Sequence, residues 1–451
     1  MRLTILGGGG FRVPLVYRAL ALDPLHLVDE VVLLDDDPLR VRAIARVLQH
    51  LGSGPTVRIA NGLDDALRAT EVVFSAVRVG GTSGRVRDER LALDLGVLGQ
   101  ETTGPGGIAY ALRTLPVATR IAQRVRDLAP SAWVLNFTNP AGMVTAAMQQ
   151  VLGDRVIGIC DSPTGLVRRV SRAIGVDEAR VVPGYAGLNH LGWLRSAVVD
   201  GVDLLPGLLD DEVALATFEE GRLFGPDLLS LLGCVPNEYL YYYYYAREAT
   251  AAVRSADRTR GEVIADQQRD LYPRLAEAVD PLGVWNDARL AREQGYLAEA
   301  RAPSADRDEV DLAGGGYEQV ALATMRALVT GVPAELILNV RNGSSASGLP
   351  ALAQLPADAV VEVPTLVDDR GPHPHVQAPF DDHQLSLVAA LRAVETATVD
   401  AAASGSRTAA LRAFTVHPLV DSAALAQELL DAYLGQAPDR RTTAATRPTP
   451  T

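Results

Sequence analysis

Cys160 and His190 carry side chains whose chemistry suits a divalent metal ion. Cys160 closes the apolar run at 156–160, and His190 stands thirty positions later in the sequence GLNHLGW. Two protein ligands leave coordination positions open for substrate oxygens, and a mixed set of S, N and O ligands accepts Mn²⁺ or a similar divalent ion. The alternative is a small buried cysteine and a histidine that is satisfied in the core. Two separated residues do not decide between these interpretations.

A glycine-rich segment follows the first apolar run of the chain. It comprises Gly7, Gly8, Gly9, Gly10, Phe11 and Arg12. Glycines permit a tight turn and let backbone N–H groups approach a pyrophosphate at the N-terminus of the next helix. The G-x-G-x-x-G pattern is incomplete because Arg12 stands at the third glycine, so a turn without a ligand is the alternative. Asp35 ends the second apolar run, where a carboxylate accepts hydrogen bonds from a ribose diol and favours NAD over NADP.

Further polar residues follow later apolar runs, where ligands gather in a doubly wound sheet. Asn136 and Asn139 suit sugar hydroxyls or a nicotinamide ribose, although a helix N-cap ahead of Pro140 is the alternative. Arg85 begins a polar segment, 85–107, that is expected to connect a strand end to a helix and to hold a lid or a turn near the cofactor. The charges of this segment suit an anionic polyol or, alternatively, a solvated surface.

Six tyrosines lie within residues 239–245. At helical spacing they cannot all face one way, so most are expected to pack or to lie on the surface. One or two are expected to line a cleft. A phenol made acidic by a nearby cation can act as a general base, which gives the cluster a catalytic role as one interpretation.

The first 160 residues alternate short apolar runs with amphipathic segments of helical length. This pattern predicts βα units around a mainly parallel sheet. Strands are expected at about 2–6, 31–35, 72–77, 132–136 and 155–160, and helices at about 13–22, 38–51, 63–69, 109–128 and 141–152. We therefore predict an α/β fold with a Rossmann-like, doubly wound sheet.

From about residue 181 the pattern changes. Strands are expected at 181–182, 194–199, 336–340 and 360–363, a mostly helical region at 226–300, and helices near 384–403 and 421–434. These elements predict a second, mixed α+β subdomain. The expected organisation is an NAD-binding domain at 1–180, a substrate, metal and oligomerisation domain at 181–436, and a flexible tail at 437–451.

The chain has 451 residues, of which 48% are hydrophobic and 22% charged, and this composition predicts a globular protein with two subdomains. The formal net charge is −13 and the positive residues are interspersed with acids, which argues against nucleic-acid and membrane partners. The apolar run before Gly7 is too short for a secretory signal, and no run approaches the roughly 20 residues of a membrane span. A cytoplasmic location is therefore expected. The two cysteines of the chain are expected to be reduced.

Together these segments resemble the NAD- and divalent-metal-dependent glycosidases of glycoside hydrolase family four, especially the 6-phospho-β-glucosidases. The resemblance covers most of the chain. It rests on the glycine-rich start, GQETTGPGG at 99–107, NFTNPAG at 136–142, Cys160, NHLGW at 189–193, the tyrosine cluster and NVRNG at 339–343. This family is an exception to glycoside hydrolysis by two carboxylates.

The resemblance implies a redox-assisted elimination. NAD⁺ takes hydride from C3 of the sugar, a base removes the acidified C2 proton, the C1 substituent leaves, water adds, and the retained NADH returns the hydride. The metal stabilises the enediolate as its charge develops. The roles that the resemblance implies are Cys160 and His190 as Mn²⁺ ligands, Tyr239 as the base with Tyr242 second, Arg85 and Asn139 as substrate contacts, and Arg260 as a phosphate contact. The family also implies a homodimer or homotetramer.

Two positions depart from the family pattern. Asp161 follows the metal cysteine, where the β-glucosidases often have Asn, and it resembles the phospho-α-glucosidase pattern in which this carboxylate is the general acid. Gly10 replaces a serine in the loop near the nucleotide. Phosphorylated β-glucosides are the favoured substrates, with 6-phospho-α-glucosides or non-phosphorylated glycosides as alternatives. Other candidate functions are a plain NAD-dependent dehydrogenase of a hydroxy acid or polyol, and a non-catalytic NAD sensor.

Overall fold

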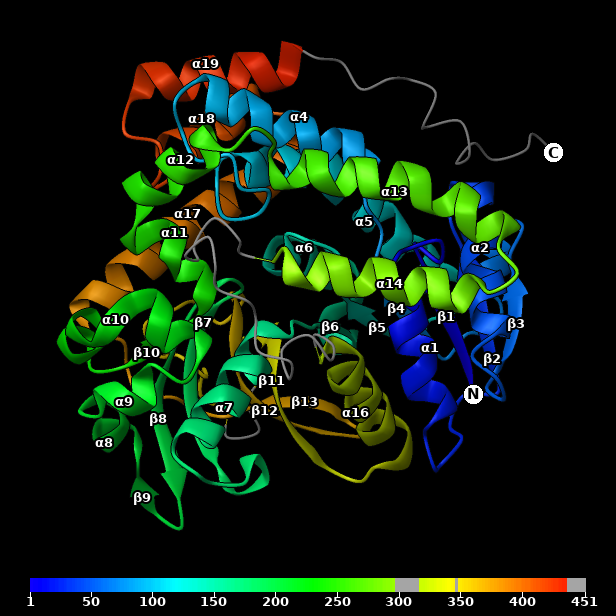
Figure 1. The fold of residues 1–451 in the computed structure, drawn as a ribbon, viewed down its shortest axis with the longest axis horizontal. Coiled ribbons are helices and arrows are strands. Elements are labelled where there is room, and N and C mark those ends of the chain that lie inside the picture. Colours follow the sequence, from blue (N-terminus) through cyan, green and yellow to red (C-terminus); the bar gives the residue numbers. More distant parts are fainter. Residues whose placement is uncertain (297–315, 345–347, 436–451) are drawn as a thin grey trace.

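The computed structural model describes residues 1–296, 316–344 and 348–435. Its strands form one sheet, of which six strands are parallel: β1 (Arg2–Leu6), β2 (Glu30–Leu34), β3 (Thr56–Ile59), β4 (Val72–Ser75), β5 (Trp133–Asn136) and β6 (Val156–Gly158). Their order across the sheet is β3-β2-β1-β4-β5-β6 (Figure 1). This is the strand order of doubly wound dinucleotide-binding folds, so the predicted fold class is confirmed.

Helices connect these strands and cover both faces of the sheet. They are α1 (Val13–Ala21), α2 (Pro38–Gln49), α3 (Leu63–Leu67), α4 (Gly81–Asp94), α5 (Gly106–Leu128), α6 (Ala141–Leu152) and α7 (Ser162–Ala173). Successive residues of a strand point to opposite faces, and Leu3, Thr4 and Ile5 of β1 are all fully buried. The five helices predicted for this half are confirmed.

Three elements of this half were not predicted, and one of them, α7, begins after residue 160, where the predicted βα pattern ends. β3 lies where no strand is predicted. The sequence gives no strand signal there because β3 is short, half-exposed and at the edge of the sheet. α4 occupies part of the segment that is predicted to be a connection. It lacks an apolar stripe because it buries Asp88 and Glu89, which pair with Arg113 and Arg85. A buried face made of ion pairs is indistinguishable from a solvated face in the sequence.

The second half extends the same sheet with antiparallel strands. β11 (Ala334–Arg341) pairs with β6, and the order continues through β12 (Val360–Asp368), β7 (Val182–Leu188), β8 (Leu191–Val199) and β10 (Val235–Pro236). Two short strands, β9 (Val202–Asp203) and β13 (Gly371–Pro374), flank β8 and β12. The strands predicted for this half are confirmed. One sheet spans both halves, and the domain boundary near 180 stays a prediction.

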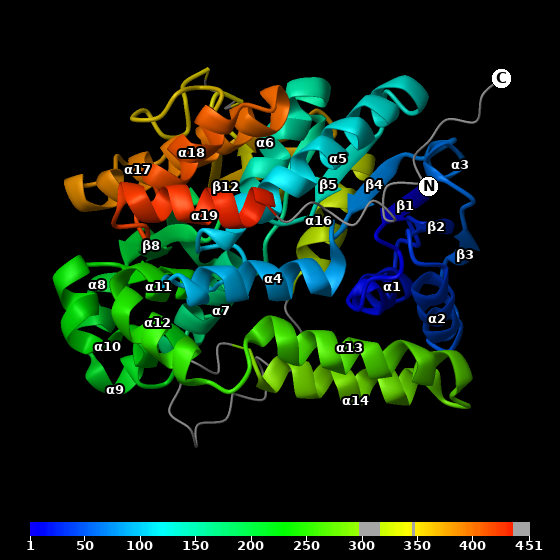
Figure 2. The same ribbon diagram turned by 90° about the horizontal axis from the view of Figure 1, so that it is seen from above.

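The helices of the second half pack partly around this extension and partly against the first half. They are α8 (Leu205–Leu209), α9 (Glu212–Leu215), α10 (Glu219–Leu232), α11 (Tyr241–Tyr244), α12 (Ala246–Ser255), α13 (Arg260–Glu277), α14 (Pro281–Gln294), α16 (Tyr317–Thr330), α17 (Asp382–Ser404), α18 (Arg407–Thr415) and α19 (Ala423–Gly435). A capping box at Thr259 begins α13, and Asp280 caps α14. α13 and α14 lie side by side in both views and pack against α2 (Figures 1 and 2). This pair brings the second half of the chain over the first.

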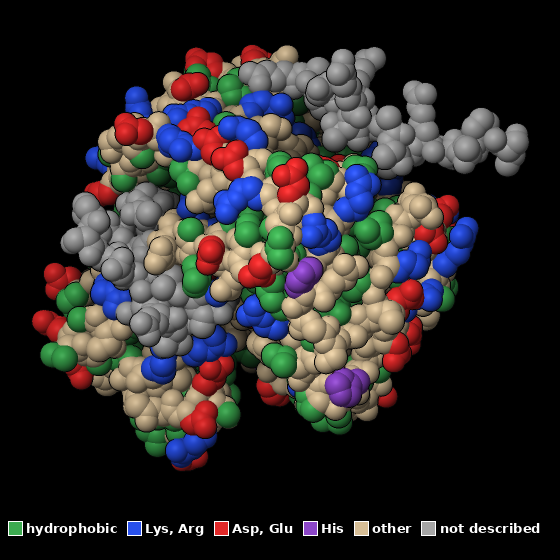
Figure 3. Space-filling view, turned by 45° about the vertical axis from the view of Figure 1, so that its right-hand side comes forward, with side chains coloured by type: hydrophobic (Ala, Val, Ile, Leu, Met, Phe, Trp, Pro, Cys, Tyr) green, Lys and Arg blue, Asp and Glu red, His purple; other side chains and the backbone are tan. Residues whose placement is uncertain are grey.

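Acidic and basic side chains are interspersed on the face shown in Figure 3. None of the helices within the described ranges is both long and apolar enough to span a membrane. The predicted tail at 437–451 lies outside the described residues.

Candidate active site

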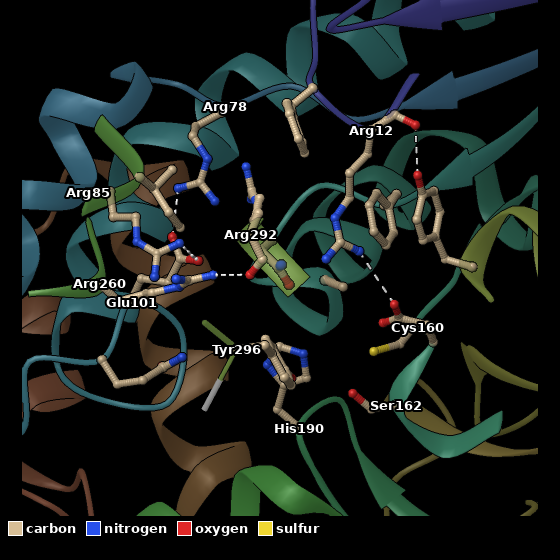
Figure 4. A pocket seen from close by; sticks show the side chains of 18 of the residues that line it. Arg12, Arg78, Arg85, Glu101, Cys160, Ser162, His190, Arg260, Arg292 and Tyr296 are labelled. Carbon is tan, nitrogen blue, oxygen red and sulfur yellow. Dashed lines mark hydrogen bonds and ion pairs between the residues drawn. The ribbon is translucent and has the colours of Figure 1, made fainter. Parts of the chain in front are cut away.

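A cavity of about 710 Å³ lies at the carboxyl ends of β1, β4, β5 and β6 (Figure 4). Residues that follow these strands line it, at 10–13, 76–78, 137–139 and 159–162. The opposite wall comes from α13 and α14. Because the carboxyl ends of parallel strands meet at one edge of a sheet, segments far apart in sequence converge here, as expected.

Cys160 and His190 both line this cavity. Cys160 follows β6 and is buried, and burial raises the pKa of its thiol. His190 stands in the two-residue turn between β7 and β8 with φ of +63°, a left-handed conformation that is costly for a residue other than glycine. Its Nδ1 lies 3.1 Å from Oγ1 of Thr102, which orients the ring. Burial lowers the pKa of His190 to about 4, so the ring is neutral, as a metal ligand must be.

This pair fits a two-ligand metal site. Among the described residues, no group of three or more His, Cys, Asp and Glu side chains is arranged to hold a metal ion. A divalent ion at Cys160 and His190 therefore depends on substrate or water oxygens for its remaining coordination, as the donor set allows. Binding requires the thiolate, so a bound ion has to offset the raised pKa of Cys160.

Tyr239 lies directly against His190, one of the two predicted metal ligands. It belongs to the short 3₁₀ helix Glu238–Leu240, and its ring stacks on that of His190, with ring centres 3.7 Å apart and planes 8° apart. Burial and the charge of Glu238 raise the pKa of its phenol. The hydroxyl of Tyr296 donates to the Tyr239 hydroxyl at 3.0 Å. A base at this position therefore needs a cation beside it.

The remaining tyrosines divide as expected between the cavity and packing. Tyr242 is buried and lines the cavity next to Tyr239, with ring centres 6.4 Å apart. Outside the cavity, the hydroxyl of Tyr244 bonds His383, and the hydroxyl of Tyr245 donates to the carbonyl of Phe224. Both candidates for the base thus face the cavity.

Asp161 follows Cys160 and joins the glycine-rich loop to the helical wall. Its Oδ2 accepts from Nη1 of Arg12 at 3.4 Å, and Nη2 of Arg12 lies 3.5 Å from Oε1 of Glu293 on α14. Burial raises the pKa of the Asp161 carboxyl, and Arg12 opposes that shift. A carboxyl group with a raised pKa keeps more of its proton, which a general acid needs.

The loop at 7–12 has the geometry of a phosphate cradle. Gly7 has φ of +83°, and a Cβ there would stand 2.4 Å from the carbonyl oxygen of Ala76. The loop ends at the N-terminus of α1, where the helix dipole favours an anion. Gly10, Phe11 and Arg12 form part of the cavity wall, so the residues present fit a dinucleotide.

Asp35 and Asn136 lie behind this wall rather than on it. Asp35 accepts the N–H of Gly9 at 2.8 Å, and burial raises the pKa of its carboxyl to about 6. Asn136 is fully buried, and its amide bonds Thr138 in the turn after β5 and Thr145 of α6. Both residues brace the segments that reach the cavity. Their predicted contacts with the cofactor stay predictions.

Three predicted substrate residues, Arg85, Asn139 and Arg260, line the cavity. Arg85 is held by Glu89 at 2.7 Å and by Glu101 at 2.6 Å. Arg260 begins α13, and its Nη2 donates to the backbone carbonyl of Arg292 at 2.7 Å. The three side chains therefore meet in one cavity, and their contacts with substrate stay predictions.

Arg292 is a residue of this cavity that sequence reasoning misses. It projects from α14 into the cavity, and its guanidinium lies over the ring of Phe11 at 4.9 Å (Figure 4). Burial, together with Arg12 and Arg260, lowers the pKa of Arg292 to about 9. In the part of the chain that the structure describes, its guanidinium has no hydrogen-bond or ion-pair partner. Crowded positive charge of this kind favours an anion. An arginine on an amphipathic helix gives no such signal in sequence.

Family models match nearly the whole chain. The model described as family 4 glycosyl hydrolase matches residues 2–176, and the model of the family 4 glycosyl hydrolase C-terminal domain matches residues 185–420. The chain belongs to the family 4 glycosyl hydrolases. The predicted family is confirmed.

Relatives of this family 4 glycosyl hydrolase carry names of both anomeric types. A Bacillus subtilis strain 168 protein named "Probable 6-phospho-beta-glucosidase" is 30% identical over 96% of this chain and 95% of its own. The 6-phospho-alpha-glucosidase of Leptotrichia buccalis is 27% identical over 95% and 96%. The solved Thermotoga maritima 6-phospho-beta glucosidase with manganese, NAD⁺ and glucose-6-phosphate has a TM-score of 0.81 and 26% identity, covering 96% of this chain and 98% of that one.

Proposed function

We propose that this family 4 glycosyl hydrolase cleaves 6-phospho-glucosides, with the β anomer favoured. The observation that carries the proposal is the meeting of three features in one cavity: the dinucleotide loop, the pair Cys160 and His190, and a tyrosine stacked on that histidine at 3.7 Å. A plain dehydrogenase needs no metal ligands at this place. The names and bound molecules of the relatives support the same reaction.

The residues of the chain divide the work of the redox-assisted elimination. When bound, NAD⁺ supplies a hydride acceptor for C3 of the sugar, and a divalent ion such as Mn²⁺ supplies a Lewis acid that also favours a phenolate nearby. Cys160 and His190 hold the ion, and residues 10–12 hold the dinucleotide phosphates. Tyr239 takes the proton from C2 of the sugar, with Tyr242 as the second candidate.

Arg260 and Arg292 bind the 6-phosphate of the substrate. Their guanidinium groups belong to one cluster in the cavity, in which the charge of Arg260 helps to lower the pKa of Arg292. A phosphate dianion placed between them relieves that repulsion and accepts bidentate hydrogen bonds. Arg85, fixed by two carboxylates, and Asn139 orient the sugar hydroxyls.

The second candidate is the α anomer, and Asp161 is the observation that favours it. Its raised pKa suits a general acid for the leaving group, while its contact with Arg12 at 3.4 Å works against protonation. We also propose that the enzyme is cytoplasmic and forms a homodimer or homotetramer. The first statement extends the expectation from the sequence and the second extends the family resemblance, and they are tested by fractionation and by light scattering.

Cofactor accounting tests the proposed function. The protein is incubated with NAD⁺, Mn²⁺ and a thiol reductant, with aryl 6-phospho-glucosides of both anomers and with their non-phosphorylated counterparts. We expect release of the phenol without net NADH, solvent deuterium at C2, and faster cleavage of the β anomer. Net NADH without phenol release indicates a dehydrogenase instead. Equal rates without the phosphate contradict the phosphate site at Arg260 and Arg292.

A further inference from the structure

Three aromatic side chains from the second half of the chain hold the carbonyl groups of the glycine-rich loop. The hydrogen bonds run from Tyr272 of α13 to Gly9 at 2.8 Å, from Trp285 of α14 to Phe11 at 2.8 Å, and from Tyr317 of α16 to Arg12 at 2.7 Å. All three aromatic side chains are buried. We call them the aromatic clamp. It joins segments that lie more than 260 positions apart in the sequence.

Each ring of the aromatic clamp also faces a guanidinium group from the first half of the chain. The distances from guanidinium carbon to ring centre are 4.4 Å for Arg40 and Tyr272, 5.8 Å for Arg18 and Trp285, and 5.3 Å for Arg12 and Tyr317. Separations below about 6 Å are attractive. The same pair of contacts thus occurs three times, and it ties α13, α14 and α16 to the loop and the helices that follow it.

The aromatic clamp helps to fix the direction in which three peptide groups of the loop face. In a trans peptide the carbonyl and the following N–H point in opposite directions. Because Trp285 holds the carbonyl of Phe11, the N–H of Arg12 points away from α14. The N–H groups that follow the held carbonyls of Gly9 and Arg12 belong to Gly10 and Val13. They donate to the carbonyls of Gly7 and Gly10 at 2.8 and 3.1 Å, respectively. The N–H of Gly9 is held separately by Asp35, so the aromatic clamp adds to the hydrogen bonds that already order the glycines.

The cavity lies between the loop and the helices that carry the aromatic clamp. Arg12 lines one side, and Ile264 of α13 and Arg292 of α14 line the other. A dinucleotide whose phosphates rest on the loop therefore lies beneath α13 and α14. We propose that the aromatic clamp closes the cofactor site, so that NAD enters and leaves only when its hydrogen bonds open. The identity of the ligand rests on the proposed function, whereas the closure rests on the contacts above.

Stopped-flow fluorescence with NADH as the probe tests the closure on the full chain. The variants are Tyr272→Phe, Trp285→Phe and Tyr317→Phe, each of which keeps an aromatic ring and removes one donor to the loop. Tyr272→Phe also removes the acceptor of a hydrogen bond from Arg40 at 2.9 Å, so its effect is expected to be the largest of the three. Loss of one hydrogen bond of ordinary net strength makes opening about fivefold more frequent. We expect the association and dissociation rate constants to rise together by about that factor, with the dissociation constant changed by less than about twofold.

Tyr17→Phe is the matched control. Tyr17 is a buried tyrosine of α1 whose hydroxyl donates to the carbonyl of Pro55 at 2.9 Å, outside the aromatic clamp. Its variant loses the same kind of bond and is expected to leave both NADH rate constants unchanged. Thermal unfolding of all four variants shows whether each is folded at the temperature of the measurement.

The outcomes separate the closure from the proposed function. Unchanged rate constants in all three clamp variants overturn the closure. A larger dissociation constant with an unchanged association rate constant also overturns the closure. That result means that the hydrogen bonds stabilise the NADH-bound loop and do not limit entry. If NADH binds the wild-type protein and the clamp variants behave like Tyr17→Phe, only the closure is wrong. If the wild-type protein does not bind NADH, the proposed function is wrong with it.

Discussion

The backbone of His190 shows most directly what single residues contribute to this site. A left-handed residue with a side chain costs about 1–2 kcal/mol, and glycine avoids that cost. The chain nevertheless places an imidazole there, stacked on Tyr239 and oriented by Thr102. A position that gives up stability for a particular side chain points to a function of that side chain. Cys160, at the same cavity, is the natural partner.

Loss of either proposed metal ligand is expected to stop turnover and to leave dinucleotide binding intact. Cys160→Ser and His190→Ala remove a ligand from the proposed metal site, while the loop at 10–12 is untouched. We expect metal-dependent hydrolysis to be abolished and NAD binding to stay largely intact. Phenol release at increasing Mn²⁺ and NADH fluorescence measure the two effects. Wild-type rates in either variant contradict the ligand assignment.

A second pair of variants isolates the cost of the backbone at His190. His190→Ala and His190→Gly both lack the imidazole, but only alanine carries a Cβ at φ of +63°. We therefore expect the glycine variant to be more stable than the alanine variant by about 1 kcal/mol. Urea unfolding in the absence of metal compares them. Equal stability means that the turn relaxes once the imidazole is gone.

Tyr239→Phe is expected to block proton removal from C2 of the sugar. The variant keeps the ring that stacks on His190 and removes the hydroxyl. Exchange of solvent deuterium into C2, followed by NMR, should fall by about 100-fold or more, as for the loss of a general base. Tyr242→Phe serves as the control because Tyr242 lines the same cavity. If Tyr239→Phe shows normal deuterium exchange and Tyr242→Phe loses it, Tyr242 is the base and Tyr239 is not.

At the scale of elements, strands were more predictable than the contacts between distant helices. The run at 31–34 predicts β2 because fully buried strands need continuous apolar residues. α4 escapes prediction because Asp88 and Glu89 on its buried face resemble surface charges. Likewise, nothing near Trp285 indicates that its indole reaches Phe11, 274 positions away. The meeting of Cys160 and His190 in one cavity was predictable because a family motif surrounds each one.

One buried ion pair joins α7 to α10, and its rupture is expected to be costly. Nε of Arg169 lies 2.9 Å from Oε2 of Glu220, which is fully buried. Arg169→Ala leaves a buried carboxylate without this partner, so we expect a loss of about 3–5 kcal/mol in the free energy of unfolding. Arg180→Ala breaks the exposed pair with Asp200 and should cost at most about 1 kcal/mol. Urea unfolding compares them, and equal losses contradict the argument.

For the molecule as a whole, every fixed positive side chain is an arginine, because the sequence contains no lysine. Arginine makes bidentate bonds and stacks on aromatic rings, and it stays charged when buried more readily than lysine does. The cavity, the aromatic clamp and the pair between α7 and α10 all depend on these properties. Buried carboxyl groups without an arginine beside them are therefore the groups whose charge state responds most to pH.

Glu362 is such a group, at the junction of the two halves of the sheet. It accepts hydrogen bonds from Tyr185 of β7, from Asn189 in the turn after it, and from Asn339 of β11, at 2.8–3.2 Å. It is 1% exposed, and burial raises the pKa of its carboxyl from 4.5 to about 7. The folded state thus binds this proton more tightly than the unfolded state does. Its contribution to stability is complete below about pH 4.5 and is lost as the pH rises through about 7.

Glu362→Gln should remove this dependence because the amide has the same shape and cannot ionise. A pKa difference of this size corresponds to about 3 kcal/mol, so the variant should gain about that much relative to the wild-type protein between pH 4.5 and pH 8. Urea unfolding at a series of pH values measures the gain, with Glu428→Gln on the exposed side of α19 as the control variant. If the difference between Glu362→Gln and wild type is the same at both pH values, Glu362 does not titrate in this range. The ionised carboxylate is then stabilised by its three donors, which would make the junction a fixed charge instead of a proton-dependent one.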